Sequence, residues 1–572
     1  MKKVLKFLKP YWFIAIWAPI FMIIEVLADL LQPRFLSTIV TNGIEAGNMN
    51  VIYSTGIKML IVVAIGFSGG VLSAVFASIA SQRFGCSLRE AAFNKVTSFS
   101  IEQTDKFSTG SLITRLTSDI TAAQDFVSMG LRMVVRVCMQ FVGGIVMILT
   151  LNVKFGIVFA CALPLQILLI VIMVRMTAPL FSVVQDKLDN VNSVVRENVV
   201  GARVVKSFTT EEYEINRFKE ANNSLTEKTY RVQKIIGILN PFIMIIMNLS
   251  VIAILSIGGY EVRVSGMEVG DAMAAVTYVT QILMSVMIIG NMFQNLTKAK
   301  ACMGRIAEIL EVEPAVKTGE KNFPKDFDYI TLKNVSFAYP PSEEKILEDI
   351  NLKIPVGKTT AILGATGSGK STLLKLICRF YDCNGEILFG DEEIKNISLD
   401  SLRENISFVL QKSELFTGTI SENIKQGKDN ATDEEIENAS KIAQAHEFIS
   451  GFANGYETFV AEKGASLSGG QKQRISIARG LIKKPKILVF DDATSALDLS
   501  TEAALRKAMN ENLEGVTVIM VAQRIASVMS ADNIAVIDDG KIAAFGNHET
   551  LIKTSDIYKD IYNSQMKEGD DR

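Results

Sequence analysis

A glycine-rich loop between a strand and a helix is the strongest chemical signal in the sequence. The apolar run 360–363 predicts a buried strand, and 373–377 predicts the helix that follows. The loop between them reads Gly364, Ala365, Thr366, Gly367, Ser368, Gly369, Lys370, Ser371 and Thr372. Glycines let successive backbone N–H groups point at phosphate oxygens, and the helix N-terminus adds its dipole. The segment therefore predicts a phosphate-binding loop (P-loop) for ATP, with Lys370 on the β/γ-phosphates and Ser371 on Mg²⁺.

A second apolar strand ends in two carboxylates. Residues 486–490 predict this strand, and Asp491 and Asp492 follow it directly. A carboxylate at the end of a strand beside a phosphate loop can hold Mg²⁺ through the ion's hydration shell. We therefore assign Asp491 to the metal.

A second anion site lies between these two strands. The residues that form it are Leu467, Ser468, Gly469, Gly470 and Gln471. They begin a predicted helix over 472–481, and glycines with a serine at a helix N-terminus bind anions. One nucleotide does not require two such sites from one chain. The second site is therefore expected to serve ATP held by another subunit.

Six apolar stretches can each cross a bilayer, which takes about 20 residues. They lie at 12–31, 59–80, 134–151, 155–174, 241–260 and 272–293. The polar connectors 81–133 and 175–240 have helical patterns, so we expect the membrane helices to continue beyond the bilayer. They should return through turns near Thr109-Gly110 and Thr209-Thr210.

The elements predict a multidomain chain, with an all-α transmembrane domain of six helices followed by an α/β P-loop ATP-binding cassette. The expected boundaries are 1–313 for the membrane domain, 314–328 for a linker and 329–572 for the nucleotide-binding domain. Lysines precede the first span, residues 35–57 after it contain no Lys or Arg, and both long connectors are rich in Lys and Arg. The positive-inside rule therefore predicts a multi-pass membrane protein with both termini in the cytoplasm.

Two carboxylates inside the first span, Glu25 and Asp29, are one helical turn apart and share a face. Intramembrane charges are costly and mark function or pairing. They are expected either to line a substrate cavity or to pair with other helices, and the sequence does not choose between these.

Composition excludes several classes of function. The formal net charge is −2, so no global basic field favours nucleic acid. The six cysteines form no CxxC pair, and the two histidines are too few for a histidine-based metal centre.

The spans and the ordered motifs together resemble an ABC exporter half-transporter over essentially the whole chain. The resemblance implies a place in the cell (inner) membrane and a signature motif at 467–471 that binds the partner's ATP. It also implies that Tyr339 stacks on adenine, although a tyrosine there could equally serve packing. Gln411 would touch Mg²⁺ and sense the γ-phosphate, and Ser495 and Asp498 would belong to the dimer-contacting D-loop.

Two positions depart from the family pattern. Asp492 stands where the family has Glu, and Gln523 stands where it has the switch His. Asp492 shortens the carboxylate by one methylene, and a displacement of about 1 Å can cost on the order of 100-fold in rate. Gln523 can donate a hydrogen bond but cannot take up a proton as imidazole does. The chain is expected to bind ATP and hydrolyse it poorly.

The expected partner is a homologous half-transporter with Glu and His at the matching positions, in a heterodimer. Ser468 would complete the partner's hydrolytic site. The expected substrates are hydrophobic or small amphipathic molecules, the surroundings are membrane lipid, and no nucleic acid is expected. The alternatives are a slow homodimeric exporter, with Asp492 as a weak base, and an ATP-gated regulator that does not pump.

Overall fold

The computed structural model describes residues 1–264, 266–340, 342–522 and 524–570. The chain divides into two compact units. The membrane unit combines Met1–Thr97 with Thr109–Val312, and the cassette unit combines Ser98–Ser108 with Glu313–Arg572. In this division the short segment Ser98–Ser108 falls with the cassette, and so do Glu313 and the expected linker 314–328.

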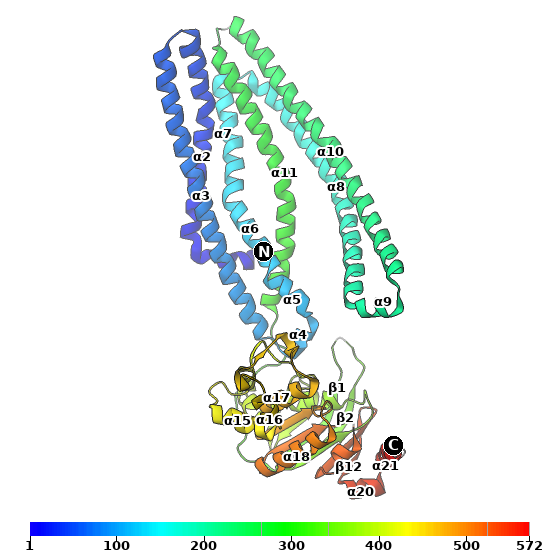
Figure 1. Ribbon diagram of the computed structural model, residues 1–572. Coiled ribbons are helices and arrows are strands. Elements are labelled where there is room, and N and C mark those ends of the chain that lie inside the picture. The colour runs from blue at the N-terminus through cyan, green and yellow to red at the C-terminus, as the bar shows by residue number, and fades with distance from the viewer. Residues whose placement is uncertain (265, 341, 523, 571–572) are drawn as a thin grey trace. The chain divides into compact units, whose positions relative to one another are not determined.

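The membrane unit consists of long helices (Figure 1). Their bounds are α1 Lys2–Leu5, η1 Lys6–Tyr11, α2 Trp12–Thr38, η2 Ile39–Glu45, α3 Met49–Thr97, α5 Thr109–Leu116, α6 Ser118–Met129, η3 Gly130–Val134, α7 Val135–Leu151, α8 Phe155–Val200, α9 Ala202–Phe208, α10 Glu211–Val264 and α11 Val269–Glu311. Six helices of the described chain are long and apolar enough to cross a membrane. The prediction of six spans is confirmed.

The membrane helices extend far beyond the thickness of a bilayer. Helix α10 has 54 residues, which is about 80 Å at ~1.5 Å per residue, whereas the hydrocarbon core measures about 30 Å. The chain reverses between α9 and α10 at Thr209, which has a left-handed backbone with φ 54°. The other return is made by two short helices, α4 (Ile101–Lys106) and α5, where the sequence suggested a simple turn.

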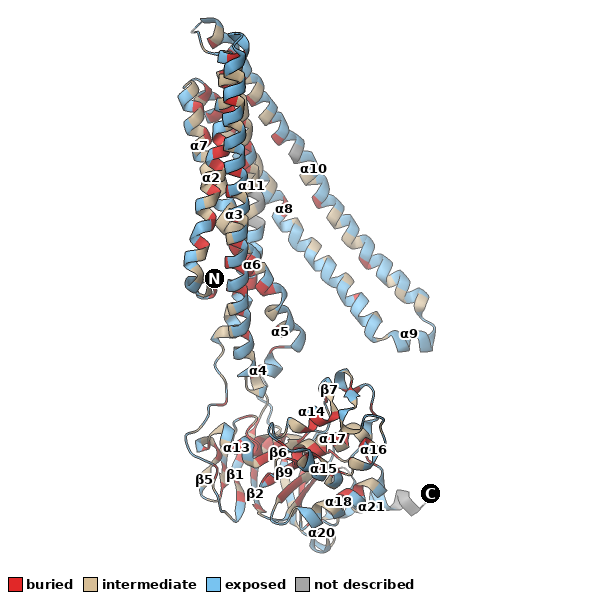
Figure 2. Ribbon diagram, turned by 60° about the vertical axis from the view of Figure 1, so that its left-hand side comes forward, coloured by how far each residue is buried: buried red, intermediate tan, exposed pale blue. Residues whose placement is uncertain are grey.

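Burial is uneven within the membrane unit. Figure 2 shows buried residues gathered where α2, α3, α7 and α11 pack, with a core that includes Met22, Leu30, Tyr278 and Ile282. The parts of α8 and α10 next to α9 are mostly exposed, and Phe208 is 74% exposed. Within the described residues of the membrane unit, this end of the hairpin is left exposed.

The cassette is built on a six-stranded sheet of order β12-β11-β3-β10-β9-β6. The strands are β3 Thr359–Leu363, β6 Ile406–Val409, β9 Ile487–Asp491, β10 Thr517–Val521, β11 Asn533–Asp538 and β12 Lys541–Gly546. All neighbouring pairs are parallel except β11 with β12. Strand β3, which precedes the P-loop, and strand β9, which ends at Asp491, therefore both pair with β10. This arrangement confirms the predicted α/β fold.

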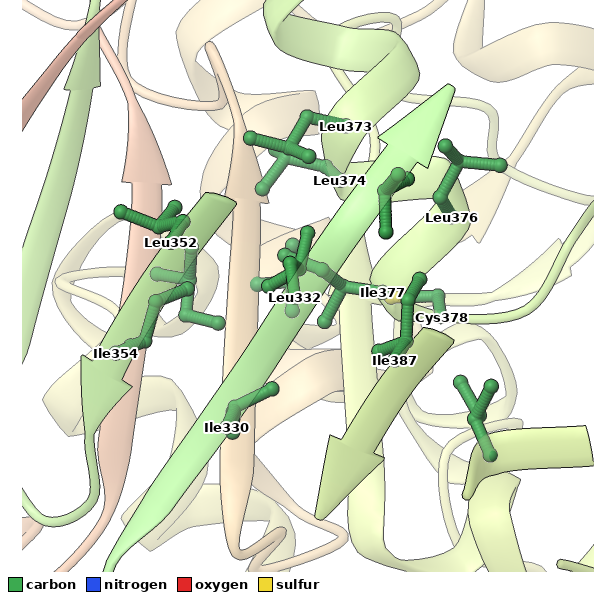
Figure 3. Packing of buried hydrophobic residues seen from close by; sticks show 14 of the residues in the cluster. Ile330, Leu332, Leu352, Ile354, Leu373, Leu374, Leu376, Ile377, Cys378 and Ile387 are labelled. Atoms are coloured by element: carbon green, nitrogen blue, oxygen red, sulfur yellow. The ribbon is translucent and has the colours of Figure 1, made fainter. Parts of the chain in front are cut away.

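A second, antiparallel sheet of order β2-β1-β4-β5 covers the helix that follows the P-loop. Its strands are β1 Tyr329–Phe337, β2 Leu347–Pro355, β4 Asn384–Phe389 and β5 Glu392–Glu393, and a separate ladder joins β7 Gly418–Thr419 to β8 Phe459–Val460. Figure 3 shows Leu332, Leu352 and Ile387 of this sheet packed with Leu373 and Ile377 of α12 (Lys370–Ile377). This apolar contact holds the P-loop helix in place.

The remaining cassette helices surround the two sheets. They are η4 Ile394–Asn396, α13 Leu399–Asn405, α14 Ile420–Lys425, α15 Asp433–Ile442, α16 His446–Ser450, η5 Gly455–Glu457, η6 Glu462–Gly464, α17 Gly469–Leu481, α18 Leu499–Asn512, α19 Ile525–Val528, α20 His548–Thr554 and α21 Asp556–Asp570. The residues 314–328 pack on the cassette as well, since Lys321 bridges to Ile397 and Phe323 is buried.

Candidate nucleotide-binding site

The sheet register brings the predicted site residues to one edge. In parallel pairing, Val521 of β10 lies opposite Ile362 of β3 and Asp491 of β9. Val409 of β6 lies opposite Phe490. The carboxyl ends of parallel strands are where open α/β sheets bind ligands. The P-loop, the paired aspartates and Gln411 therefore follow β3, β9 and β6 at the same edge of the sheet.

The P-loop backbone needs its glycines. Gly367 and Gly369 have φ of 88° and 97°, in the left-handed region that favours glycine. A Cβ added to Gly364 would lie 2.2 Å from the carbonyl oxygen of Ile537, so no side chain fits there. Tight packing at the start of the loop and left-handed turns within it shape the cradle.

Lys370 lies inside this loop. Its Nζ donates to the carbonyl oxygens of Gly364 and Ala365 at 2.9 and 2.6 Å. Burial lowers the pKa of the Lys370 ammonium, and the carboxylates of Asp492 and Asp491 act in the opposite direction. A partly buried cation beside two carboxylates is poised to exchange carbonyl contacts for phosphate oxygens.

The residues at the metal position fit a hydrated divalent cation. The Ser371 hydroxyl donates to Asp491 Oδ1 at 2.5 Å, so the two oxygen ligands face each other. Hydroxyl and carboxylate oxygens are the ligands that Mg²⁺ prefers. Ser368 Oγ is buried and has no hydrogen-bond partner among the described residues, which suits a phosphate oxygen or an N–H donor brought by a ligand.

Asp492 has an unusual backbone. Its φ is 51°, left-handed for a non-glycine residue, and its side chain is buried at 5% exposure. Burial raises the pKa of the Asp492 carboxyl and neighbouring Asp491 adds to this, while a hydrogen bond from Gln411 and the Lys370 charge oppose it. Strained backbone and a perturbed acid often coincide at functional sites.

Gln411 contacts the same carboxylate. Its Nε2 donates to Asp492 Oδ2 at 3.1 Å. The structure thus brings together Gln411, Lys370, Ser371, Asp491 and Asp492. Gln523 lies outside the described residues.

Tyr339 lies at the edge of this site. Its hydroxyl is 3.2 Å from the Thr372 hydroxyl, and its ring packs edge-on against Phe337 and Tyr381 at centroid distances of 4.9 and 5.2 Å. The side chain is only partly buried. Its ring therefore lies beside α12. Its packing against Phe337 and Tyr381 is compatible with stacking of the same ring on a ligand.

The signature segment forms a well-capped helix start. Ser468 is the N-cap of α17, and its side chain accepts from the backbone N–H of Gln471 in a capping box. Gln473 of the same helix accepts from the backbone N–H of Ala496 at 3.0 Å. The signature helix is thereby attached to the segment that contains Ser495.

The segment after Asp492 connects the P-loop site to the signature segment at the start of α17. The Ser495 hydroxyl donates to the Asp492 carbonyl at 3.0 Å. Asp498 caps α18 by accepting from the Thr501 backbone at 2.8 Å. Hydrogen bonds to neighbouring hydroxyl and backbone groups hold the pKa of the Asp498 carboxyl well below its usual range.

Two features of the cassette were not found from the sequence. Tyr381, after the P-loop helix, donates its hydroxyl proton to Asp105 of α4, and burial together with this bond raises the pKa of the Tyr381 phenol. Arg379 is buried at 3% exposure. It donates to the backbone carbonyl of Lys317 in the linker and to those of Ile394 and Ile397 at η4. Neither residue belongs to a glycine-rich or acidic motif, so the sequence offered no direct signal.

The intramembrane carboxylates are paired with another helix. Arg136 of α7 contacts Glu25 Oε1 at 3.0 Å and Asp29 Oδ2 at 3.4 Å. Of the two expectations left open by the sequence, pairing between helices is therefore present.

Comparison with known proteins identifies the architecture. Residues 15–286 match the family described as ABC transporter transmembrane region, and residues 347–495 match the ABC transporter family. A Bacillus subtilis protein named as an uncharacterized ABC transporter ATP-binding protein, YfiB, is 38% identical over 100% of this chain and 99% of its own length. The chain belongs to the ABC transporter family.

Other relatives of this ABC transporter carry more specific names. An ATP-dependent lipid A-core flippase of Desulfotalea psychrophila is 34% identical over 88% of this chain and 89% of its own length. ABC transporter B family member 1 of Dictyostelium discoideum is 31% identical over 100% of this chain and 63% of its own length. This chain is accordingly a multi-pass membrane protein of the exporter type, an ATPase-coupled transporter whose cassette binds ATP.

Proposed function

We propose that this ABC exporter works as one half of a heterodimer, binding Mg²⁺-ATP at a degenerate site and contributing its signature motif to a hydrolytic site on its partner. The observation that carries the proposal is the position after the metal-binding aspartate. Asp492 is one methylene shorter than the family's Glu, has left-handed backbone and is bonded to Gln411. A carboxylate so held is poorly placed to orient an attacking water.

In this proposal the P-loop binds ATP. Gly367 and Gly369 allow backbone N–H groups to face phosphate oxygens, Lys370 neutralises the β/γ-phosphates, and Tyr339 stacks on adenine. Ser371, Asp491 and Gln411 would hold Mg²⁺, which neutralises charge on the phosphates when it is bound. The chain's own contribution is binding and positioning.

The second half of the proposal concerns Ser468. Its hydroxyl and the N–H groups at the start of α17 form an anion site that does not belong to the P-loop of the same chain. ATP bound on a partner's P-loop would be contacted by this helix start. Two nucleotides shared in this way hold two cassettes together, and hydrolysis at the partner's site releases them.

The exposed hairpin of α8, α9 and α10 supports a second chain as partner. Val200 and Phe208 are 82% and 74% exposed beside the hairpin's reversal. Helix α4 stands between α3 and α5 in the chain but belongs to the cassette unit, where Asp105 accepts from Tyr381, and this supports coupling of the cassette to the membrane helices. We place both termini in the cytoplasm and the spans in the cell membrane. The flippase relative supports amphiphiles as cargo.

Two alternatives predict different behaviour. A homodimer would use Asp492 as a weak base at both sites, so the isolated chain would turn over ATP. An ATP-gated regulator would bind ATP without concentrating any solute. Uphill transport into sealed vesicles separates the regulator from both exporters, because a gate cannot move a solute against its gradient.

The deciding experiment compares the chain purified alone with the chain co-purified with its partner. We expect weak turnover alone, strong turnover in the pair, and loss of that turnover when Ser468→Arg is made in this chain. Asp492→Asn should leave the turnover of the pair largely intact. Vigorous, vanadate-sensitive turnover by the isolated chain, abolished by Asp492→Asn, would support the homodimer instead.

A further inference from the structure

The switch position, Gln523, lies in the chain between two fixed points of the cassette. Before it, β10 ends at Val521, which pairs in register with both β3 and β9, and Ala522 is buried at 3% exposure. After it, α19 begins at Ile525, which is 2% exposed. The positions of Ala522 and Ile525 therefore limit where residues 523–524 can place their side chains.

The second fixed point is held by a side chain from a distant part of the cassette. The backbone N–H of Ile525 donates to Gln565 Oε1 of α21 at 2.7 Å. The first N–H groups of a helix have no acceptor within the helix, and a buried N–H without an acceptor costs free energy. Gln565 therefore satisfies a donor two residues after Gln523.

Helix α21 packs one face on the core that contains α19. Tyr558 is fully buried in this core, and Ile561 and Tyr562 pack against it. Residues three, four and seven positions after Tyr558 share its helix face, so Gln565 follows Ile561 and Tyr562 along the same side. Gln565 itself is exposed at the end of this face. Replacing its side chain therefore leaves the apolar core filled.

The start of α21 is fixed by contacts that do not involve the nucleotide site. The Tyr558 hydroxyl lies 2.7 Å from His548 Nδ1 of α20, and the Tyr558 backbone N–H donates to Ser555 Oγ at 3.3 Å. The Tyr562 ring packs against the His548 ring at a centroid distance of 5.7 Å. Figure 1 shows α20 and α21 together beside β12. Gln565 thus acts on Ile525 from a helix that is anchored elsewhere.

We infer that Gln565 is a positioning residue for the switch segment, and that its bond to the Ile525 N–H sets the preference of this cassette for ATP over ADP. The inference rests on the proposed ATP site, where Gln523 donates a hydrogen bond to the γ-phosphate. A donor that is already in place binds its acceptor without a further cost of ordering. Because ADP has no γ-phosphate, the effect of Gln565 should be confined to the triphosphate.

A purely structural role for Gln565 predicts a different result. If the bond served only to attach α21 to α19, its loss would lower the melting temperature and would weaken both nucleotides equally or neither of them. The ratio of the two affinities would then stay at the parent value. This ratio therefore separates positioning of the switch segment from general support of the fold.

The test uses the full-length chain in phosphatidylcholine nanodiscs with Mg²⁺, and a fluorescent nucleotide that is displaced by AMP-PNP or by ADP. AMP-PNP carries a γ-phosphate that is not cleaved. Gln565→Leu should weaken AMP-PNP about fivefold, the effect expected of one hydrogen bond, and should leave ADP unchanged. Unchanged ADP binding also shows that the P-loop is folded in the variant. Equal effects on the two nucleotides, or no effect on either, would overturn the inference.

Three further variants test the assigned contact. Gln565→Glu keeps an oxygen that accepts from Ile525 and should retain the parent ratio. Asn563→Leu makes the same amide-to-leucine change at an exposed position of α21 and should also retain it. A stop codon at position 565 removes the acceptor by another route and should reproduce Gln565→Leu. A lowered ratio in Asn563→Leu would show that the amide-to-leucine change acts without the Ile525 bond.

A double-mutant cycle establishes whether Gln565 acts through the switch residue. Gln523→Ala should lower the AMP-PNP preference, and adding Gln565→Leu should lower it no further, because the same contact is already absent. Additive losses, or no effect of Gln523→Ala, would contradict the inference. Since AMP-PNP is not cleaved, the result is separable from hydrolysis. A lost preference in Gln565→Leu together with vigorous ATP turnover by the isolated parent would leave the positioning role standing and contradict the proposed heterodimer.

Discussion

Gln411 Nε2 donates to Asp492 Oδ2 at 3.1 Å, which joins the end of β6 to the end of β9 across the sheet edge. The contact holds the Asp492 carboxylate by a hydrogen bond. At this position the family's longer Glu would orient the attacking water. The bond uses Gln411 Nε2 and leaves Oε1, the atom that would contact Mg²⁺, available. The site is therefore suited to holding ATP rather than cleaving it.

Lengthening the carboxylate should therefore raise ATP turnover by the isolated chain. We expect Asp492→Glu to increase the rate, and Asp492→Glu combined with Gln523→His to increase it by up to about 100-fold, the cost of a displacement of about 1 Å. Steady-state phosphate release measures this. Asp492→Asn serves as the control and should stay at or below the parent rate, and a parent rate already matching the double variant would refute the degenerate site.

The pKa of Asp492 makes a prediction about stability. Burial raises this pKa, so the folded state favours the protonated acid. The stability that this group contributes is present below the unfolded pKa of about 3.9 and is lost as pH rises through the raised folded value. At pH 7.5 the ionised carboxylate opposes folding. Asp492→Asn should raise the cassette's melting temperature at pH 7.5, and the difference should shrink towards pH 4.

Asp498 is the matched control because its pKa is shifted in the opposite direction. Its folded pKa is lowered, so its stabilisation is present above the unfolded pKa and is lost as pH falls through the folded value. Asp498→Asn should lower the melting temperature at pH 7.5, although asparagine remains a good N-cap. Reaction of the buried Cys378 thiol with a maleimide dye reports cassette unfolding. Shifts of the same sign in both variants would contradict this account.

The P-loop geometry predicts a strong effect of one methyl group. Gly369 has φ 97°, and a Cβ there would lie 2.6 Å from Leu347 Cδ2. Gly369→Ala should weaken ATP binding at least about tenfold, because the loop must move to relieve both strain and collision. Fluorescent nucleotide titration measures it. Gly515→Ala has a similar strain, with φ 78°, but open space around its Cβ; a comparable loss there would show that strain alone is responsible.

Sequence reasoning located the parts of the site that are contiguous in the chain. The P-loop, the signature segment and the paired aspartates each combine a short motif with its flanking strand or helix, so local pattern was sufficient. The Gln411–Asp492 bond depends on strand register, and Arg136 joins α7 to α2 across more than 100 residues. Short helices such as α4 carry little periodicity, so their place in the cassette unit follows from tertiary contacts.

Arg379 predicts how the linker is held. Its guanidinium donates to the carbonyl oxygens of Lys317, Ile394 and Ile397 at 2.7, 3.1 and 3.1 Å. Arg379→Met leaves these carbonyls without their donor, which should cost at least about 2 kcal/mol of cassette stability. Chemical denaturation of the full chain followed by Cys378 labelling measures the loss. The exposed Arg403→Met is the control, and protease sensitivity should increase over 314–328 only in the Arg379 variant.

The bond between Tyr381 and Asp105 predicts a coupling effect distinct from stability. Asp105 belongs to α4, which lies between the membrane helices α3 and α5 in the chain, yet α4 is part of the cassette unit. Tyr381→Phe removes one hydroxyl and leaves the ring contacts with Phe337 and Tyr339 in place. In the reconstituted pair we expect ATP turnover to persist while transport per ATP falls severalfold.

A double-mutant cycle decides whether the two side chains act as a pair. Asp105→Asn should reproduce the loss of transport per ATP, and the double variant should be no worse than either single variant, because the same bond is absent in all three. Glu102 lies on the same short helix, and Glu102→Gln tests whether any charge change on α4 has this effect. Additive losses would mean that Tyr381 and Asp105 act through separate contacts, so that α4 is attached to the cassette by its packing and by the Gln103 bond to the Glu313 carbonyl at 3.3 Å.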